Sequence, residues 1–223
     1  MMCAIFSVKG GSGVSVAAAA LGLVWARAAD TLLVDFGGDI PTILGRADGP
    51  GPGVNDWLNA GDGVPIDSLR RLEIDVQPGL SLVPQGGALT DVGASRGRVL
   101  AAVLASDPRA VVADCALAQT AAAREVVRMA SQRIVVMRGC YVGIKKLVEC
   151  DLRPTGIALI VEPGRALGRK EIEQATGLTV QCEIPFDPAI SRAVDAGLLA
   201  TRIPTALAKS LARGIVATTG LAA

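Results

Sequence analysis

The chain has 223 residues, of which 51% are hydrophobic and 3% aromatic, and its 22 Lys and Arg nearly balance its 21 Asp and Glu, for a net charge of +1. This length fits a single domain, 1–223, with a sizeable core, and the near-neutral balance gives no sign of a nucleic-acid or anionic-membrane partner, although a local basic patch stays open. Because the chain has no histidine, an imidazole zinc site and a His-based catalytic triad are excluded.

Apolar strand-like runs alternate with helix-like runs along the chain. Strands are expected at Met2–Val8, Thr31–Phe36, Leu80–Pro84, Ala110–Asp114, Arg133–Met137, Gly156–Val161 and Thr179–Glu183. Helices are expected at Val14–Ala29, Gly97–Ser106, Gln119–Ser131, Gly143–Asp151, Arg169–Gly177 and Pro204–Ala217. Several strands are nearly continuous apolar runs, as is typical of parallel strands covered on both faces. The pattern predicts a doubly wound α/β fold, a mostly parallel sheet flanked by helices, with ligands at the carboxyl ends of the strands.

A turn-rich segment separates the second and third expected strands. Asp48–Gly53 (Asp-Gly-Pro-Gly-Pro-Gly) is the strongest turn cluster, and short helices are expected after it at Val54–Ala60 and Val64–Leu72. We interpret this insertion as a surface loop region and not as a domain boundary.

The cysteines and the first helical run bear on the compartment. The five cysteines form an odd set without close pairs, which favours reduced thiols over disulfides or metal ligands; they are Cys3, Cys115, Cys140, Cys150 and Cys182. The apolar run after Val14 is interrupted by Arg27, short of the roughly 20 residues that a membrane span needs. We therefore expect a cytoplasmic protein.

The segment Ser7–Ser15 (Ser-Val-Lys-Gly-Gly-Ser-Gly-Val-Ser) links the first expected strand to the first helix. The first N–H groups of a helix lack partners within it, and the helix dipole places partial positive charge there. Glycines let such a loop take positive φ and let its amides approach a phosphate. Ser15 is placed to put its hydroxyl on a magnesium ion. The segment predicts an anion site; a βα turn whose glycines serve close packing is the alternative.

This loop resembles the deviant Walker A P-loop of the ParA/MinD family, written K-G-G-x-G-K-(S/T), except that Val14 stands at the second lysine. The resemblance implies that ATP or ADP, with Mg²⁺, is bound by Lys9, Gly10, Gly11, Ser12, Gly13, Val14, Ser15 and Val16. The second lysine normally meets the β- and γ-phosphates, and unit charges about 4 Å apart interact by roughly 4 kcal/mol at an effective dielectric near 20. Its loss implies hydrolysis that is slow or absent, unless Lys9 or a partner subunit compensates.

The resemblance continues in Thr31–Asp39 (Thr-Leu-Leu-Val-Asp-Phe-Gly-Gly-Asp), which is similar to the second strand and switch I of the family, usually LLVDxDxQ. Asp35 matches the first aspartate and is, with Lys9, a catalytic candidate; a cap or turn role is its alternative. The second aspartate, which positions water or magnesium in the family, falls on Gly37. Asp39 lies two residues later, which in an extended segment is about 6–7 Å too far to hold the same water.

Three later segments also resemble the family. Ala110–Asp114 looks like its Walker B strand, so Asp114 is implied to hold magnesium through water opposite Ser15, with a strand-end cap as the alternative. After Gly156–Val161, Val161 and Glu162 replace the Asn-Arg pair that reads adenine in relatives. Ile184–Gly197 resembles the family's I-P-x-D-P stretch beside the base.

In that stretch, Pro185 and Phe186 are implied base contacts, and the alternative is a turn and helix cap begun by Asp187-Pro188. The motif order implies the ParA/MinD group over nearly the whole chain, nearest the CpaE/TadZ-like branch or actinobacterial-type partition homologues. This kinship implies a homodimer in which Lys9 reaches across to the partner's phosphates. It also implies a protein partner or cargo adaptor, and a role in positioning a chromosome or plasmid, a septum, or a pilus or secretion machine. A nucleotide-free scaffold and an active ATPase that uses Lys9 are the alternatives.

The carboxyl-terminal segment does not favour a membrane anchor. MinD proteins end in a basic amphipathic helix, whereas Thr205–Ala217 carries only Lys209 and Arg213, and Thr218–Ala223 adds no charge. DNA binding needs several cations on one face. Arg192 and Arg202 could join Lys209 and Arg213 in such a stripe, and a solvated face is the alternative.

Overall fold

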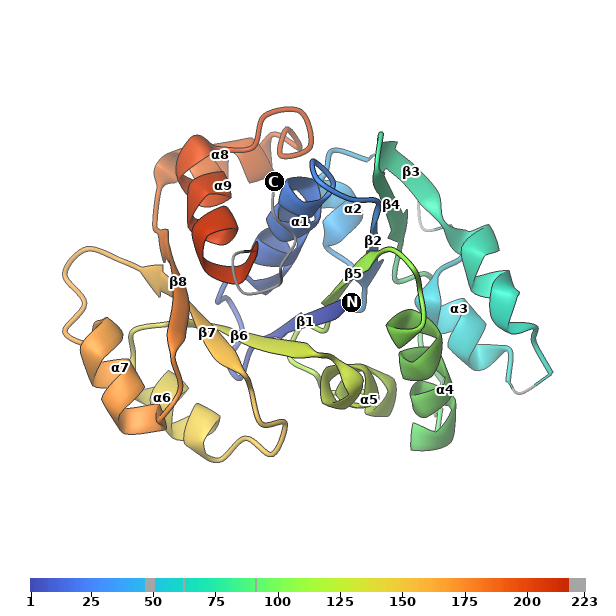
Figure 1. The fold of residues 1–223 in the computed structure, drawn as a ribbon, viewed down its shortest axis with the longest axis horizontal. Helices are drawn as coiled ribbons and strands as arrows, with labels where there is room; N and C mark the ends of the chain where they lie inside the picture. The colour runs from blue at the N-terminus through green and yellow to red at the C-terminus, as the bar shows by residue number, and fades with distance from the viewer. Residues whose placement is uncertain (47–50, 62, 91, 217–223) are drawn as a thin grey trace.

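The structure is a computed structural model that describes residues 1–46, 51–61, 63–90 and 92–216. Its strands form one eight-stranded sheet in the order β3-β4-β2-β5-β1-β6-β7-β8 (Figure 1). The strands are β1 (Met2–Phe6), β2 (Thr31–Asp35), β3 (Ile74–Gln77), β4 (Leu80–Val83), β5 (Ala110–Asp114), β6 (Gln132–Arg138), β7 (Gly156–Val161) and β8 (Val180–Pro185). Neighbouring strands are parallel except β3, which is antiparallel to β4. The predicted mostly parallel α/β sheet is confirmed.

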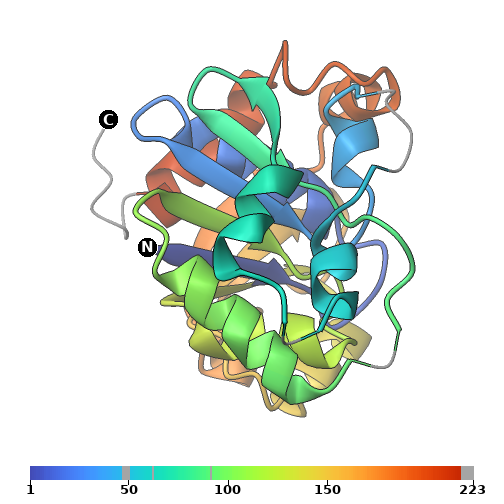
Figure 2. The same ribbon diagram turned by 90° about the vertical axis from the view of Figure 1, so that its right-hand side faces the viewer.

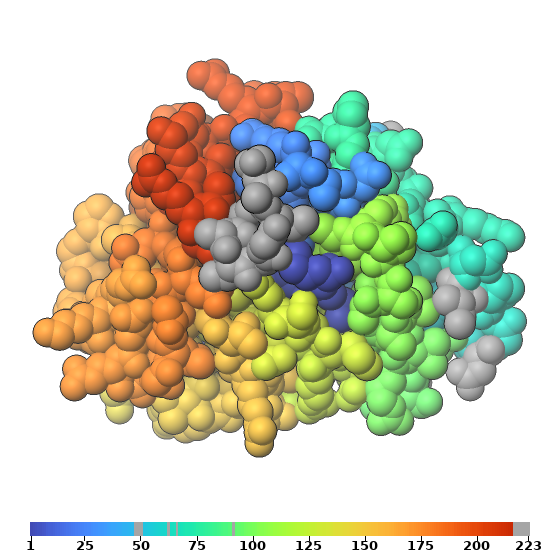
Figure 3. Space-filling view, viewed as in Figure 1, coloured from blue at the N-terminus to red at the C-terminus, as the bar shows by residue number. Residues whose placement is uncertain are grey.

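Helices cover both faces of this sheet, as the edge-on view shows (Figure 2). They are α1 (Val14–Trp25), α2 (Ile40–Ile43), α3 (Val54–Asn59), α4 (Ala94–Ala105), α5 (Ala121–Met129), α6 (Tyr141–Val148), α7 (Arg169–Thr176), α8 (Pro188–Asp195) and α9 (Thr205–Leu211), with a 3₁₀ helix at Ile66–Leu72 and a π-helical turn at Ala212–Val216. Side chains of α1, α2 and α9 pack on one face and those of α3 to α7 on the other. The carboxyl-terminal helices (red) lie beside the segment leading into β2 (blue) in the space-filling view (Figure 3).

The central strands are apolar on both faces because both faces are covered. In β1, Met2, Ala4 and Phe6 point into one core cluster, whereas Cys3 and Ile5 point into the other. This division follows from the alternation of side chains along a strand. It accounts for the nearly continuous apolar runs in the sequence.

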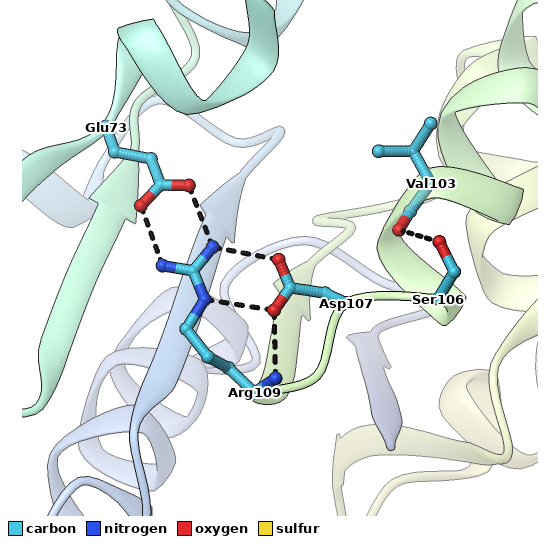
Figure 4. Close-up of polar contacts among 5 residues, drawn as sticks. All are labelled: Glu73, Val103, Ser106, Asp107 and Arg109. Carbon is cyan, nitrogen blue, oxygen red and sulfur yellow. Dashed lines mark hydrogen bonds and ion pairs between the residues drawn. The ribbon is translucent and has the colours of Figure 1, made fainter. Parts of the chain in front are cut away.

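A partly buried ion network ties the chain before β5 to the chain before β3. The Arg109 guanidinium donates to both carboxylate oxygens of Glu73, at 2.7 and 2.8 Å, and to those of Asp107, at 3.0 and 2.8 Å (Figure 4). All three side chains are at most 20% exposed. Such paired, bidentate contacts hold better than exposed ion pairs, and they fix the edge of the sheet.

Several elements differ from the sequence prediction. The antiparallel edge strand β3 and the short helix α2 were not expected as elements, α8 was indicated only by the alternative interpretation of Asp187-Pro188, and the second helix expected in the insertion is a 3₁₀ helix. The first helix ends at Trp25 and not at Ala29. Part of the expected turn cluster, residues 48–50, and the tail 218–223 lie outside the described residues.

Two expectations about the chain's chemistry can be compared with the structure. All five cysteines are free thiols, and Cys3, Cys115 and Cys182 are buried, as predicted. Within the described ranges, no helix combines the length and apolar character needed to cross a membrane.

Candidate functional site

The segment between β1 and α1 forms a compact loop held by its own serines. The Ser7 hydroxyl donates to the Lys9 carbonyl at 2.8 Å and accepts from the Lys9 amide at 3.1 Å, and the Ser12 hydroxyl donates to the same carbonyl at 2.7 Å. Gly13 is the N-cap of α1 with φ +82°, in the left-handed region that favours glycine. The loop therefore has a fixed shape at the helix start.

Close packing does not explain the loop glycines. Apart from chain neighbours, no heavy atom lies within 4 Å of the position that a Cβ would take at Gly10, Gly11 or Gly13. Positive φ is needed at Gly11 and Gly13, whereas Gly10 borders open space. The backbone here is exposed to an approaching ligand and is not pressed against another part of the described chain.

Two adjoining pockets flank this loop. The first, the loop pocket, measures about 440 Å³ and is lined by residues 9–16 with Asp39, Thr42, Ile43, Ala116, Leu117 and Val194. The second, the strand-end pocket, measures about 210 Å³ and lies between the start of α1, the ends of β6 to β8 and helix α8. Ser12, Gly13, Val16 and Val194 line both pockets. An elongated ligand could therefore occupy both.

The two positions that distinguish this loop differ in exposure. Lys9 is exposed and lines the loop pocket. Val14 is only 8% exposed and belongs to the apolar cluster beneath α1. The residue at position 14 thus contributes to the core and supplies no charge to the pocket.

Two carboxylates end neighbouring strands beside the loop. Asp35 of β2 and Asp114 of β5 are register partners, and both are fully buried. Asp35 accepts hydrogen bonds from the amides of Gly37, Gly38 and Ile40, at 2.8, 2.7 and 3.1 Å. Burial raises the pKa of Asp35, although these amides oppose the shift. Asp35 therefore organises the chain that follows β2.

Asp114 has an oxygen without a partner. Its Oδ1 accepts from the Ala116 amide at 3.0 Å, whereas Oδ2 is buried and accepts no hydrogen bond from the described residues. A Cβ at Gly37 would lie 3.3 Å from Asp114 Oδ2 and 3.4 Å from Ser15 Oγ, so both oxygens face the same small space. Burial, and to a smaller extent the neighbouring charge of Asp35, raise the pKa of Asp114 to about 7, although the nearby Ser15 hydroxyl opposes the shift.

This pair of oxygens fits a hard divalent cation. An unpartnered buried carboxylate oxygen beside a hydroxyl is the kind of donor set that Mg²⁺ accepts while it keeps several waters. The described residues contain no group of three side chains able to hold a metal alone. Water and ligand oxygens would supply the remaining coordination.

The strand-end pocket is apolar with a charged rim. Phe186 is 48% exposed here, and the Arg138 guanidinium lies 5.7 Å from its ring centroid. Glu162 pairs with Arg138 at 2.6 Å and with Arg165 at 2.5 Å, and these contacts, chiefly the one with Arg165, lower the pKa of Glu162. Asp187 caps α8 by accepting from Ala189 N at 2.8 Å. The helix cap named as the alternative is present, and the same turn leaves Phe186 exposed at the pocket.

The two pockets are linked through a glycine contact. Gly45, after α2, lies directly against Gly197, after α8, and both have positive φ, at 75° and 64°. A Cβ at Gly45 would overlap the Gly197 carbonyl oxygen. Helix α2 lines the loop pocket and helix α8 lines the strand-end pocket, so this contact joins the chain after one pocket wall to the chain after the other.

The structure brings most expected site residues together. Residues 9–16 line the loop pocket, Asp114 Oδ2 and Ser15 Oγ face the same space beside Gly37, and Pro185 and Phe186 line the strand-end pocket. Sequence reasoning missed Arg138, although its place directly after an expected strand was a signal. The four cations considered for a DNA stripe, Arg192, Arg202, Lys209 and Arg213, are all exposed.

Comparison with known proteins identifies the fold of this chain. No protein-family model matches the chain, and no curated protein matches it in sequence. The septum site-determining protein MinD of Pyrococcus horikoshii, solved with Mg-ADP, superposes with a TM-score of 0.79 over 99% of this chain and 97% of that one, at 17% identity. The chain has the fold of the ParA/MinD ATPases.

Two further structures agree on this fold. A ParA family ATPase of Chlorobium tepidum has a TM-score of 0.77 at 19% identity, covering 94% of this chain and 95% of that one. An ATP complex of McdA from Cyanothece has a TM-score of 0.73 at 17% identity, covering 94% of each. The P-loop NTPase architecture predicted from the sequence is confirmed.

Proposed function

We propose that the protein is a nucleotide-binding member of the ParA/MinD group that binds ATP or ADP with Mg²⁺, dimerises and acts in spatial positioning or partitioning. The observation that carries the proposal is the preformed glycine loop at the start of α1, which opens on the loop pocket beside the unpartnered Asp114 oxygen. Backbone amides at a helix N-terminus attract phosphate. The shared fold with proteins solved with Mg-ADP and ATP supports the same ligands here.

In this proposal each part of the site has one task. The amides of residues 9–16 hold the phosphates, and Pro185 and Phe186 contact the base in the strand-end pocket. Ser15 and Asp114 hold Mg²⁺, Asp114 through water; the ion would neutralise phosphate charge. Asp35, whose oxygens accept hydrogen bonds from three backbone amides, holds the pocket wall in place.

Hydrolysis is proposed to be slow or absent. The isopropyl group of Val14 is packed into the core and offers no positive charge to a transferring phosphoryl group. Lys9 is the one loop cation in residues 9–16, and its exposure leaves it able to reach the phosphates of a second copy. A homodimer with Lys9 exchanged between protomers is therefore part of the proposal.

The proposed partners follow the same reasoning. MinD of Aquifex aeolicus was solved in complex with MinC, which supports a protein partner or cargo adaptor for this chain. DNA is a weaker candidate that rests on four exposed cations of the carboxyl-terminal segment. The free thiols fit a cytoplasmic location.

Two specific observations favour other functions. The burial of Val14 favours a scaffold that keeps the fold and binds no nucleotide. The exposed Lys9 at the loop pocket favours an active ATPase in which Lys9 replaces the missing lysine. The scaffold and the active ATPase predict different outcomes in the experiment below.

The test is calorimetric titration of the purified chain with ATP or ADP in Mg²⁺, alongside light scattering of its oligomeric state and phosphate release. We expect binding, nucleotide-dependent dimerisation that Lys9→Ala weakens, and little phosphate release. Lys170→Ala, an exposed lysine on α7, is the matched control. No binding at millimolar nucleotide would contradict the proposal and favour the nucleotide-free scaffold. Turnover that Lys9→Ala abolishes would favour the active ATPase.

A further inference from the structure

A third pocket lies on the β6 side of the glycine loop. This β6-side pocket measures about 220 Å³ and lies between loop residues 8–12 and the chain from the end of β6 into the first turn of α6, with Arg165 from the segment after β7. It shares residues 9–12 with the loop pocket, whereas residues 13–16 line only the loop pocket and the strand-end pocket. Pockets for drug-sized ligands measure roughly 300–1,000 Å³, so the β6-side pocket suits a smaller ligand.

The β6-side pocket has an excess of positive charge. Lys9, Arg138 and Arg165 line it, and no acidic side chain of the described residues does. Glu162 pairs with both arginines, at 2.6 Å to Arg138 and 2.5 Å to Arg165. One carboxylate therefore serves two guanidinium groups, and Lys9 has no ion-pair partner in the described chain. Three positive charges against one negative charge leave +2 at the pocket.

Hydrogen-bond donors without acceptors also border this pocket. Arg138 Nε is buried and finds no acceptor among the described residues. Helix α6 begins beside the pocket, which Cys140 and Gly143 line, and the N-cap residue Cys140 makes no side-chain cap hydrogen bond. The first amides of a helix lack partners within it and carry partial positive charge. Since buried donors are normally paired, the pocket lacks a ligand with acceptor oxygens.

The fold holds these groups in place before any ligand binds. A Cβ at Gly139 would overlap the Leu167 carbonyl oxygen, so the turn before α6 packs directly against the segment that carries Arg165. The Arg165 amide donates to the Glu162 carbonyl at 3.4 Å, and its guanidinium donates to the carboxylate of the same residue. That carboxylate also pairs with Arg138. The two arginines are therefore preorganised, which lowers the entropic cost of binding.

We propose that the β6-side pocket binds a small dianionic oxyanion of the phosphate class, either free phosphate or a small phosphate monoester. The charge of +2 matches the dianion, and guanidinium groups donate paired hydrogen bonds to phosphate oxygens. The oxygens of the anion would supply acceptors for Arg138 Nε and for the first amides of α6. This site is additional to the proposed nucleotide site and does not depend on it.

The test is calorimetric titration of inorganic phosphate, and separately of glycerol 3-phosphate, into the nucleotide-free protein with EDTA at about pH 8. The wild type should bind at least one of these anions; binding of phosphate alone identifies a site for the free ion, and binding of glycerol 3-phosphate identifies a site for monoesters. Arg165→Gln should weaken binding about 10-fold or more, because a cation of the pocket is lost. Glu162→Gln should strengthen it about 3- to 10-fold, because a competing negative charge is removed. Arg27→Gln removes an exposed arginine after the far end of α1 and controls for net charge, so it should leave the affinity unchanged.

The variants separate this site from the glycine loop and from a purely structural ion pair. Arg165 lines neither the loop pocket nor the strand-end pocket, so an anion held there would be bound about equally by the wild type and Arg165→Gln. Equal affinity of these two proteins would overturn the inference, as would the absence of binding to the wild type. If Glu162 serves only the fold, Glu162→Gln would lower the melting temperature without strengthening binding, and this result would also overturn the inference. Because the titrations contain no nucleotide, their failure would leave the proposed nucleotide binding untouched.

Discussion

Val14→Lys tests whether the site lacks only its second cation. The wild-type side chain is 8% exposed and packs in the apolar cluster under α1, so its replacement should lower the free energy of unfolding by about 1–2 kcal/mol. The adjacent loop pocket of about 440 Å³ gives the longer side chain room to extend toward a bound phosphate. The variant should therefore fold, with a lower melting temperature.

The gain in affinity follows from charge. An ammonium about 4 Å from a phosphate oxygen gains roughly 4 kcal/mol at an effective dielectric near 20. Ordering a lysine side chain opposes this by about 2 kcal/mol. The difference of about 2 kcal/mol corresponds to roughly 30-fold tighter binding of Mg-ADP.

The assay is calorimetric titration of Mg-ADP into the wild type, Val14→Lys and Val14→Met, with thermal unfolding of each. Val14→Met alters the core without adding charge, so it isolates the electrostatic contribution. If Val14→Lys is folded but binds Mg-ADP no more tightly than Val14→Met, the reasoning about the missing charge is refuted. Phosphate release by Val14→Lys would show in addition that hydrolysis was lost at this position alone.

Four further changes test other parts of the molecule. Phe186→Ala should weaken ADP binding about 5- to 30-fold through lost stacking yet leave pyrophosphate binding unchanged, as displacement titrations would show. Arg109→Gln should lower the free energy of unfolding by about 1–3 kcal/mol in urea titrations, because two mostly buried carboxylates lose their partner. Gly45→Ala should lower both thermal stability and ADP affinity, since its Cβ would push Gly197 and the wall of the strand-end pocket away; equal affinity would show that the two pockets are independent. Because its pKa is raised, Asp114 binds its proton more tightly in the folded protein than in the unfolded chain, so folding stability falls as pH rises from about 4 to about 7, by up to about 1.4 kcal/mol per pH unit. Asp114→Asn should therefore be more stable than the wild type at pH 8 and not at pH 4. An equal difference in unfolding free energy between variant and wild type at both pH values would contradict this.

The sheet could be predicted where its strands are buried on both faces. β5 and β7 have the predicted bounds, because their continuous apolar runs leave little choice of boundary. β3 was missed because it is a four-residue edge strand, half-buried, in which only Ile74 and Val76 alternate with polar residues. α1 was extended too far since alanines continue past Trp25, where the chain must already turn toward β2.

The site, like the sheet, could be predicted from the sequence only in part. That Asp35 and Asp114 lie side by side follows from two parallel strands ending at one edge of the sheet. The placement of Asp39 could not be read from spacing, because it depends on the amides that Asp35 collects. The meeting of Arg138 with Phe186 depends on strand order, which brings the end of β6 near the end of β8 through β7.

The Asp35 carboxylate, at the end of β2, holds the following turn through three hydrogen bonds. The turn therefore loses its conformational entropy when the protein folds and not when a ligand binds. A wall of this kind does not need a terminal phosphate to become ordered. If the chain binds nucleotide as proposed, this wall would therefore distinguish a triphosphate from a diphosphate only weakly.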